Sequence, residues 1–188
     1  MVFNLLRESI GQASYPTSLT CAENQTDPLP EFRGVLSKAV TLAVLKAHLG
    51  IFSVDGSGSG QPAVLNEDGS LNSSTNPAKR GSTISIFATG GGVTNPATAD
   101  GSIVGSPPPK LTAAVRVYYP LPGEPFSQTE DIEAEVSYAG ALPGLVGGLV
   151  QVNAILPEPL PIGYVPLVLA VGDGEGSPQS NAVTVSLR

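Results

Sequence analysis

Residues able to do nucleophilic or acid–base chemistry are scarce in this sequence. The chain of 188 residues has one histidine, His48, and one cysteine, Cys21. A serine or cysteine nucleophile would have to use His48 as its base, and no Gly-x-Ser-x-Gly segment is present to display a nucleophilic serine. One cysteine and one histidine supply only half of the ligands that a structural zinc ion needs, and a single cysteine forms no internal disulfide. We therefore expect no catalytic residues.

Carboxylates lie close together in one segment, at Glu130, Asp131, Glu133 and Glu135. Paired acids of this kind hydrolyse glycosidic bonds when their surroundings separate their pKa values. Apolar residues alternate with these acids, at Ile132, Ala134, Val136 and Tyr138. Because successive side chains of a strand point to opposite faces, the alternation predicts a strand over 131–138 with an acidic, solvated outer face and with Tyr138 toward the core. The acids are interpreted as surface charges.

Oxygen-bearing side chains recur around a predicted turn at Asp68-Gly69, and Ca²⁺ prefers oxygen ligands. The candidate metal ligands are Asn66, Asp68, Ser70 and Asn72. The segment does not complete the EF-hand pattern or supply its final bidentate glutamate. Asp-Gly is also a common hairpin-turn sequence, which explains the same residues without a metal. Calcium is the one cofactor that the sequence suggests, and a plain turn is the alternative.

Tyrosines are the candidate residues for stacking against a sugar ring, because an aromatic side chain presents an apolar face and a polar tip. The candidate ligand-binding residues are Tyr118, Tyr119 and Tyr164. The chain contains no tryptophan, which argues against a large stacking platform. Polysaccharide is therefore kept as an alternative partner.

The charge of the chain argues against polyanionic partners. Sixteen acids and nine bases give a formal net charge of −7, and the segment 117–187 holds eight acids and no lysine or arginine. Nucleic-acid binding needs a basic footprint, so nucleic acid is not an expected partner. No apolar run reaches the length of about 18 residues that a membrane span requires. Arg7 and Glu8 interrupt the apolar N-terminal residues, so no signal peptide is visible.

Composition predicts an all-β protein. The chain has 22 glycines and 18 prolines with only 13% charged residues, which excludes a helical bundle. Short segments of alternating or β-branched residues are separated by turn residues, at 82–88, 111–119, 131–138, 149–156, 164–171 and 181–187. Ile84 and Ile86 are expected to face the core, and 164–171 is expected to pair with 181–187. The pattern predicts an antiparallel β-sandwich of about seven or eight strands.

The N-terminal part differs from the remainder. Residues 1–34 keep no hydrophobic period, so we expect a loosely ordered, poorly structured leader. Residues 37–44 (SKAVTLAV) match residues 180–187 (SNAVTVSL) closely, and the second copy reads as a final strand. The first copy is therefore expected to be a strand as well. The predicted domain spans 35–188, with a strand and junction over 35–52 and the main body over 53–188.

Several motifs occur in a familiar order, at 60–72 (GQPAVLNEDGSLN), 76–82 (NPAKRGS), 87–90 (FATG), 138–146 (YAGALPGLV) and 149–153 (LVQVN). Together they resemble the Solibacter-type C-terminal domain, an uncharacterised immunoglobulin-like module at the ends of large acidobacterial secreted or surface proteins. The resemblance covers about residues 37–188. It implies an immunoglobulin-like sandwich, an accessory role and an extracellular or cell-surface location, and it brings no catalytic residues to transfer.

The expected function is that of a non-catalytic accessory module. Such a module would be a spacer, an anchor or a protein-interaction domain, and its partners would be other domains or proteins of an extracellular assembly. The first alternative is a carbohydrate-binding module, which exposed aromatic residues on one sheet face would favour. The second is a small hydrolase, which a cleft uniting His48 with a serine or two carboxylates would favour.

Overall fold

A computed structural model of the chain describes residues 31–32, 35–36, 45–99, 101–120, 131–172 and 176–188. The chain divides into two compact units, Met1–Leu45 and Lys46–Arg188. The strands β1 (Glu31–Phe32) and β2 (Val35–Leu36) of the first unit pair antiparallel. The predicted strand over 37–44, Cys21 and most of the predicted leader lie outside the described residues.

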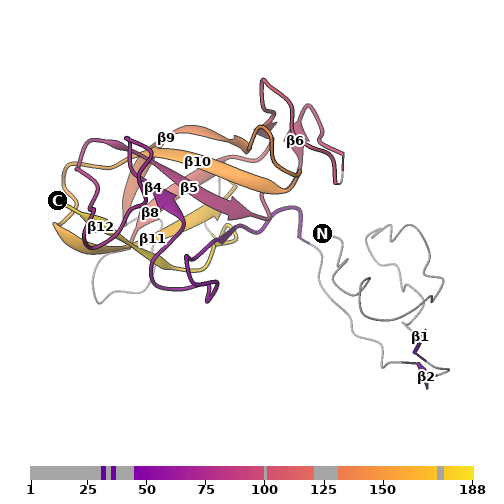
Figure 1. Ribbon diagram of the computed structural model, residues 1–188, viewed down its shortest axis with the longest axis horizontal. Coiled ribbons are helices and arrows are strands. Elements are labelled where there is room, and N and C mark those ends of the chain that lie inside the picture. Colours follow the sequence, from indigo (N-terminus) through magenta and orange to yellow (C-terminus); the bar gives the residue numbers. More distant parts are fainter. Residues whose placement is uncertain (1–30, 33–34, 37–44, 100, 121–130, 173–175) are drawn as a thin grey trace. The chain divides into compact units, whose positions relative to one another are not determined.

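The second unit is built on one antiparallel sheet of ten strands. These strands are β3 (Gly50–Ile51), β4 (Val64–Leu65), β5 (Thr83–Thr89), β6 (Thr94–Asn95), β7 (Lys110–Leu111), β8 (Val115–Tyr119), β9 (Ile132–Ala141), β10 (Leu149–Ile155), β11 (Gly163–Val171) and β12 (Val183–Leu187). The main order is β12-β11-β8-β9-β10-β5-β3, with β4 beside β5 and with β7 joining β6 to β9 (Figure 1). The predicted all-β class is confirmed, and the sheet is continuous and nearly barrel-shaped.

Most predicted strands are present with shifted ends. The segment 111–119 is divided between β7 and β8, and the strand predicted over 131–138 continues to Ala141. The predicted hairpin of β11 and β12 is confirmed, with Val165 opposite Val185. The turn at Asp68-Gly69 is also present, because Gly69 has a φ of 79° and its N–H donates to the Asn66 carbonyl at 2.9 Å. Local turn chemistry and alternation were sufficient for these elements.

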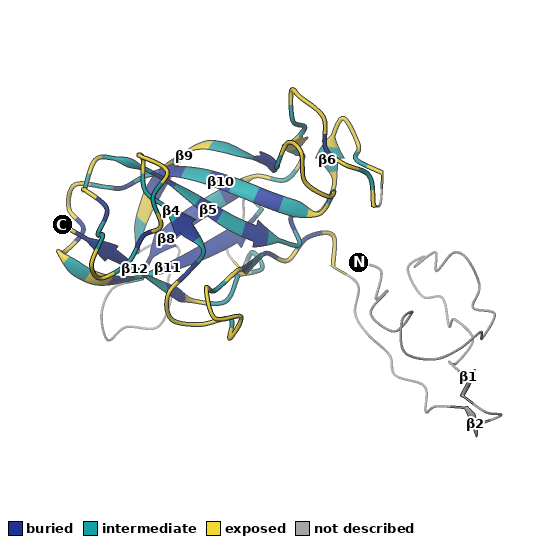
Figure 2. Ribbon diagram, in the orientation of Figure 1, coloured by how far each residue is buried: buried dark blue, intermediate teal, exposed yellow. Residues whose placement is uncertain are grey.

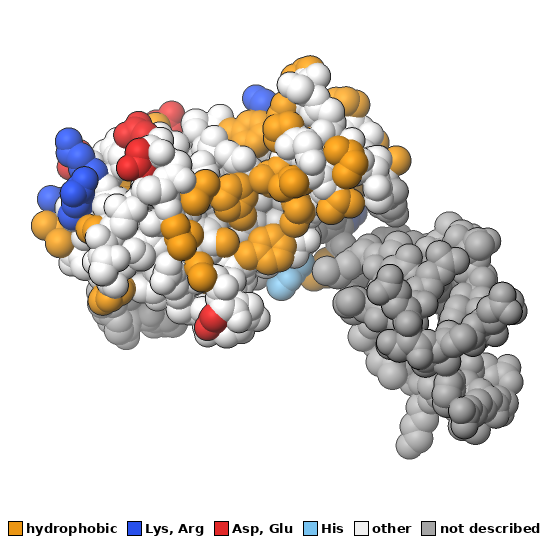
Figure 3. Space-filling model, viewed as in Figure 1, with side chains coloured by type: hydrophobic (Ala, Val, Ile, Leu, Met, Phe, Trp, Pro, Cys, Tyr) orange, Lys and Arg blue, Asp and Glu red, His pale blue; other side chains and the backbone are white. Residues whose placement is uncertain are grey.

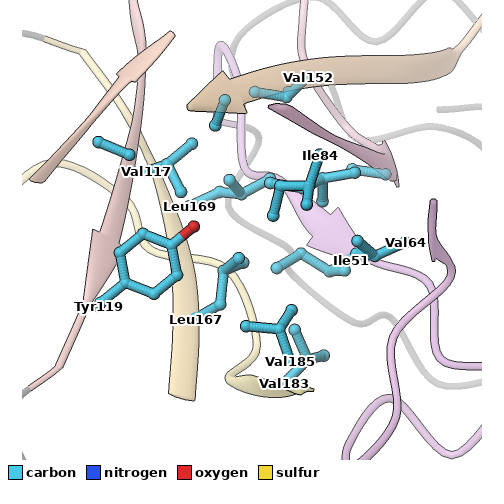
Figure 4. Packing of buried hydrophobic residues seen from close by; sticks show 14 of the residues in the cluster. Ile51, Val64, Ile84, Val117, Tyr119, Val152, Leu167, Leu169, Val183 and Val185 are labelled. Carbon is cyan, nitrogen blue, oxygen red and sulfur yellow. The ribbon is translucent and has the colours of Figure 1, made fainter. Parts of the chain in front are cut away.

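The core lies on the inner side of the curled sheet (Figure 2). Ile84 and Ile86 of β5 are buried as predicted. Ile84 points into the same interior as Val117, Leu167 and Leu169 of the strands opposite (Figure 4). The residues expected to form a junction over 47–52 also contribute to this core. Their buried side chains are Ala47, Leu49 and Ile51.

Loop segments at Gly60 and Ala78 pair with the edge strand β12 and form a seam there. Ala78 forms a parallel bridge with Leu187. The Ala78 N–H donates to the Ser186 carbonyl at 2.9 Å, and the Arg188 N–H donates to the Ala78 carbonyl at 2.8 Å. Farther along β12, the Thr184 N–H donates to the Gly60 carbonyl at 2.8 Å. These bonds satisfy main-chain N–H and C=O groups of β12, which would otherwise be an open sheet edge. Another chain therefore cannot add a strand at these positions.

A β-bulge in β9 corrects the predicted position of Tyr138. Asn153 of β10 lies opposite Tyr138, whereas the next residue, Ala154, lies opposite Val136, so Ser137 is an extra residue on β9. The extra residue reverses the alternation of the strand. Tyr138 therefore lies on the outer face of the sheet instead of the core, and Ala139 packs toward the interior.

The predicted acidic face also needs correction. Glu133 and Glu135 are exposed, but Asp131 is buried with a relative exposure of 9%. Glu133 forms an ion pair with Arg116, with 3.7 Å between Oε1 and Nε. Both side chains of that pair are partly exposed, so it adds little to stability. The solvated acids of this strand are thus two rather than three.

Candidate binding face

A straight row of side chains crosses the outer face of four strands. Gln151 of β10 lies opposite Phe87 of β5 on one side and opposite Gly140 of β9 on the other. Phe52 directly follows β3, and its N–H donates to the Phe87 carbonyl at 3.1 Å, so Phe52 continues the row. Ile51 and Ala88, the preceding opposed pair, are buried, so Phe52 and Phe87 face outward.

Tyr138 completes the row at its β9 end by lying over Gly140. A Cβ atom on Gly140 would come within 2.7 Å of Tyr138 Cζ, so the phenol ring occupies the space of the missing side chain. Tyr138 Oη donates a hydrogen bond to the Ala141 carbonyl at 2.8 Å, which fixes the ring along the strand. Partial burial raises the pKa of Tyr138, so its hydroxyl stays protonated. The aromatic row is defined here as Phe52, Phe87, Gln151 and Tyr138.

The centre of the aromatic row is an amide pair with unused hydrogen-bonding capacity. Gln151 Nε2 donates to Asn153 Oδ1 at 2.7 Å, which orients both side chains along β10. Within the part of the chain that the structure describes, Gln151 Oε1 and Asn153 Nδ2 have no hydrogen-bond partner. One acceptor and one donor group are therefore available at the surface.

One charged residue borders the aromatic row, because the exposed Lys110 of β7 lies opposite Gly140 at the β9 end of the row. The flanking positions on β3, β4, β5 and β10 are uncharged. The outward positions of the two flanking rows are held by Leu65, Ser85 and Asn153 on one side and by Gly50, Thr89 and Leu149 on the other. Phe52 is 39% exposed, and Figure 3 shows hydrophobic side chains gathered on this face over β5 and β10. A mixed aromatic and amide surface with one lysine at its end differs from a solvated sheet face, which would carry several charged residues.

The tyrosines predicted to bind a ligand do not form one exposed platform. Tyr118 and Tyr119 are buried, with relative exposures of 0% and 1%, whereas Tyr164 is 71% exposed. Tyr119 and Tyr164 both line a shallow pocket of about 30 Å³, between Pro120 and Pro161. That volume admits water but no sugar ring. Stacking by Tyr118 or Tyr119 is therefore not available in this fold.

The predicted calcium ligands are engaged in hydrogen bonds within the chain. Asn72 is buried, and its Oδ1 accepts from the Ser186 N–H at 2.9 Å. Asn66 Oδ1 accepts from Asn72 Nδ2 at 3.0 Å, and Asp68 Oδ1 accepts from the Ser70 N–H at 2.9 Å. The hydroxyl and N–H of Ser70 lower the pKa of Asp68. Among the described residues, no group of three or more His, Cys, Asp or Glu side chains is placed to hold a metal ion.

His48 lies on the surface beside β5. Its main-chain N–H donates to the Gly90 carbonyl at 2.9 Å, and its side chain is exposed. In the described ranges, the imidazole forms no hydrogen bond or ion pair with a serine or a carboxylate. The structure does not bring His48 together with the acids of β9 in a cleft.

The aromatic row was not identified from the sequence, although one of its members left a readable signal. In the alternation of β5, Ile84 and Ile86 occupy the core positions and Phe87 falls on the opposite, outer face. A large aromatic residue at an outer position is a signal that the sequence already contained. Gln151 gave no such signal, because its neighbours Phe87 and Gly140 are distant in sequence. Tyr138 was assigned to the wrong face because of the bulge.

The chain matches no protein-family model, no curated protein and no solved structure in the comparisons with known proteins. Within the described residues, no helix is long and apolar enough to cross a membrane.

Proposed function

We propose that this protein is a non-catalytic accessory module of a secreted or cell-surface protein, and that it works by contact through the outer face of β3, β5, β10 and β9. The order of its sequence motifs supports an immunoglobulin-like module of the Solibacter type and an extracellular location. The partners on this proposal are other molecules of an extracellular assembly.

The aromatic row is the observation that carries the proposal. Phe52, Phe87 and Gln151 are fixed by strand pairing, so their relative positions are set by the main chain before any partner arrives. Preorganised aromatic and amide groups favour binding because little side-chain entropy is lost when a partner docks. Aromatic side chains that remain at a surface are also enriched at binding sites.

The proposal is tested by placing a charge at the uncharged centre of the aromatic row. Gln151→Arg puts a cation in the centre of the aromatic row, and Ser74→Arg puts the same charge on an exposed loop as a matched control. The full chain and both variants are compared for self-association by sedimentation velocity, for binding to a panel of polysaccharides and for hydrolysis of nitrophenyl esters and glycosides. We expect none of the three proteins to hydrolyse these substrates. We expect Gln151→Arg, but not Ser74→Arg, to weaken self-association or polysaccharide binding at least tenfold.

Two results would contradict this function. One is binding that Gln151→Arg leaves unchanged, because the contact surface would then lie elsewhere. The other is hydrolysis that survives repeated purification and disappears in His48→Ala, because the protein would then be an enzyme.

Carbohydrate binding is the second candidate function, and a specific observation favours it. Two aromatic rings, those of Phe87 and Tyr138, flank an amide in one line on the sheet face. Sugars present apolar C–H faces and hydroxyl edges, which are complementary to rings and amides respectively.

A further inference from the structure

We infer that the aromatic row binds an extended, uncharged polysaccharide chain that lies across the strands, with sugar rings on Phe87 and Tyr138 and with the sugar between them over Gln151. This inference depends on the proposed contact function and names the ligand of the same face.

The spacing of the row fits a chain-like ligand. Phe87 and Gly140 lie on either side of β10, and neighbouring strands are about 4.8 Å apart, so Phe87 and the Tyr138 ring over Gly140 are separated by roughly 9 to 10 Å. Two pyranose rings of an extended β-linked chain cover a comparable length. Alternate sugars would then stack on the two aromatic rings.

The polar groups of the row are placed for the intervening sugar. Gln151 lies between the two rings, and its Oε1 can accept a hydrogen bond from a sugar hydroxyl. Asn153 Nδ2 lies one step along the same face of β10 and can donate to a second hydroxyl. Because Gln151 Nε2 already donates to Asn153 Oδ1, the two amides are oriented before the ligand arrives, which lowers the entropic cost of binding.

The acidic net charge of the protein favours an uncharged chain over an acidic one. One cation lies at the end of the row, because Lys110 of β7 is paired with Gly140 and is exposed on the same face. The positions between Phe87 and Tyr138 contain no lysine or arginine that could pair with a uronic acid or sulfate. The nearest ionised group along β9 is Glu135, which lies opposite Ile155 and would repel an anion. The net charge of −7 adds to that repulsion. A neutral glycan meets none of these penalties.

The β-bulge of β9 gives independent support. Without the extra residue Ser137, the regular alternation would direct Tyr138 into the core, as the sequence pattern predicted. Bulges are often found beside functional sites, where they redirect one side chain. Here the redirected side chain is the second aromatic ring of the row.

The test measures binding of cellohexaose, xylohexaose and mannohexaose to the full chain by calorimetry, with polygalacturonate as the acidic comparison. Phe87→Ala and Tyr138→Ala each remove one ring, and Gln151→Leu removes the amide while keeping its approximate size. Tyr164→Ala removes an exposed tyrosine outside the row and is the matched control. Thermal unfolding of each variant establishes that it is folded.

We expect one or more of the neutral hexasaccharides to bind, with affinity reduced about tenfold by each ring deletion and several-fold by Gln151→Leu, and unchanged in Tyr164→Ala. Binding that depends on Tyr164 but not on Phe87 would overturn the site. Binding of polygalacturonate alone, or of no oligosaccharide at millimolar concentration, would overturn the ligand class. In either of these two cases, the effect of Gln151→Arg on self-association or protein binding separates the two proposals. If Gln151→Arg abolishes that association, the contact function stands and only the polysaccharide ligand is rejected.

Discussion

The side-chain amide of Asn72 pairs with the main chain of Ser186 as a neighbouring strand would. Asn72 Oδ1 accepts from the Ser186 N–H, and Asn72 Nδ2 donates to the Ser186 carbonyl, both at 2.9 Å. Asn72 is buried, with a relative exposure of 1%, and it comes from the loop that follows β4. One side chain thus satisfies both main-chain groups of a residue on β12, beside the parallel bridge of Ala78 and Leu187.

Removal of this amide should destabilise the fold. Asn72→Ala leaves the Ser186 N–H without this acceptor in a buried setting, whereas the Ser186 carbonyl still accepts from the Ala78 N–H, so we expect a loss of about 1 to 3 kcal/mol in the free energy of unfolding. Urea unfolding followed by circular dichroism measures the change. Ser74→Ala, on the exposed part of the same loop, should change stability by less than about 0.5 kcal/mol. Equal stabilities for the two variants would show that the seam does not depend on Asn72.

The hydroxyl of Tyr119 yields a prediction of the opposite sign. Tyr119 is buried, and its Oη has no hydrogen-bond partner among the described residues, while burial raises the pKa of the phenol above its usual range. An unsatisfied buried hydroxyl is unfavourable, so Tyr119→Phe should stabilise the protein by about 1 kcal/mol. Tyr118 Oη accepts a hydrogen bond from Arg116 Nη1 at 3.3 Å, so Tyr118→Phe should not stabilise. Calorimetric melting of both variants tests the contrast, and a lower melting temperature for Tyr119→Phe would refute it.

Local features of the sequence were sufficient for much of the fold. Ile84 and Ile86 were placed in the core correctly because the alternation of β5 lies within one short segment. The hairpin of β11 and β12 was also predicted, since its turn residues and both strands are close in sequence. The face of Tyr138 was predicted wrongly because a bulge is defined by pairing with β10, which the sequence of β9 does not contain.

The sequence did not predict which side-chain amides close the sheet, because their partners are also distant in the sequence. Asn72 contacts Ser186 across 114 positions of the chain, and Asn181 contacts Ile51 across 130 positions. Asn181 accepts from the Ile51 N–H at 2.7 Å and donates to the Ile51 carbonyl at 3.0 Å, which repeats the two-point pairing of Asn72. In the sequence, Asn72 was interpreted through its turn neighbours as a calcium ligand. Long-range pairing decides the role of such residues, and an isolated segment does not reveal it.

Asp55 should make stability depend on pH in acid. Its Oδ1 accepts hydrogen bonds from the Ser57 N–H at 3.0 Å and from Ser57 Oγ at 2.7 Å, and these bonds lower the pKa of Asp55 to about 2. Because the folded pKa is lower than the unfolded one, the stabilisation is present above the usual pKa of 3.8 and is lost as the pH falls toward 2. A carbon-13 NMR titration of the carboxyl group measures this pKa directly.

The matching variant is Asp55→Asn, whose side-chain oxygen can still accept from Ser57 but does not titrate. The urea midpoint of this variant should fall less steeply than that of the natural chain between pH 4 and pH 2. Asp68 is held in the same way by Ser70 and keeps part of the acid dependence in the variant. A carboxyl pKa near 3.8 for Asp55 would contradict the hydrogen-bonded geometry.

Gly90 directly follows β5 and lies against the segment that precedes β3, and it should not tolerate a side chain. Its φ is 80°, and a Cβ atom there would collide with the carbonyl oxygen of His48, the same residue whose N–H donates to the Gly90 carbonyl. Gly56 has a similar φ of 75°, but a Cβ atom there would meet nothing within 4 Å. Gly56→Ala therefore measures the backbone strain alone, about 1 kcal/mol, whereas Gly90→Ala adds a main-chain collision and should cost at least about 3 kcal/mol. Chemical denaturation of the two variants gives the difference, and similar losses would mean that the His48 main chain moves aside freely.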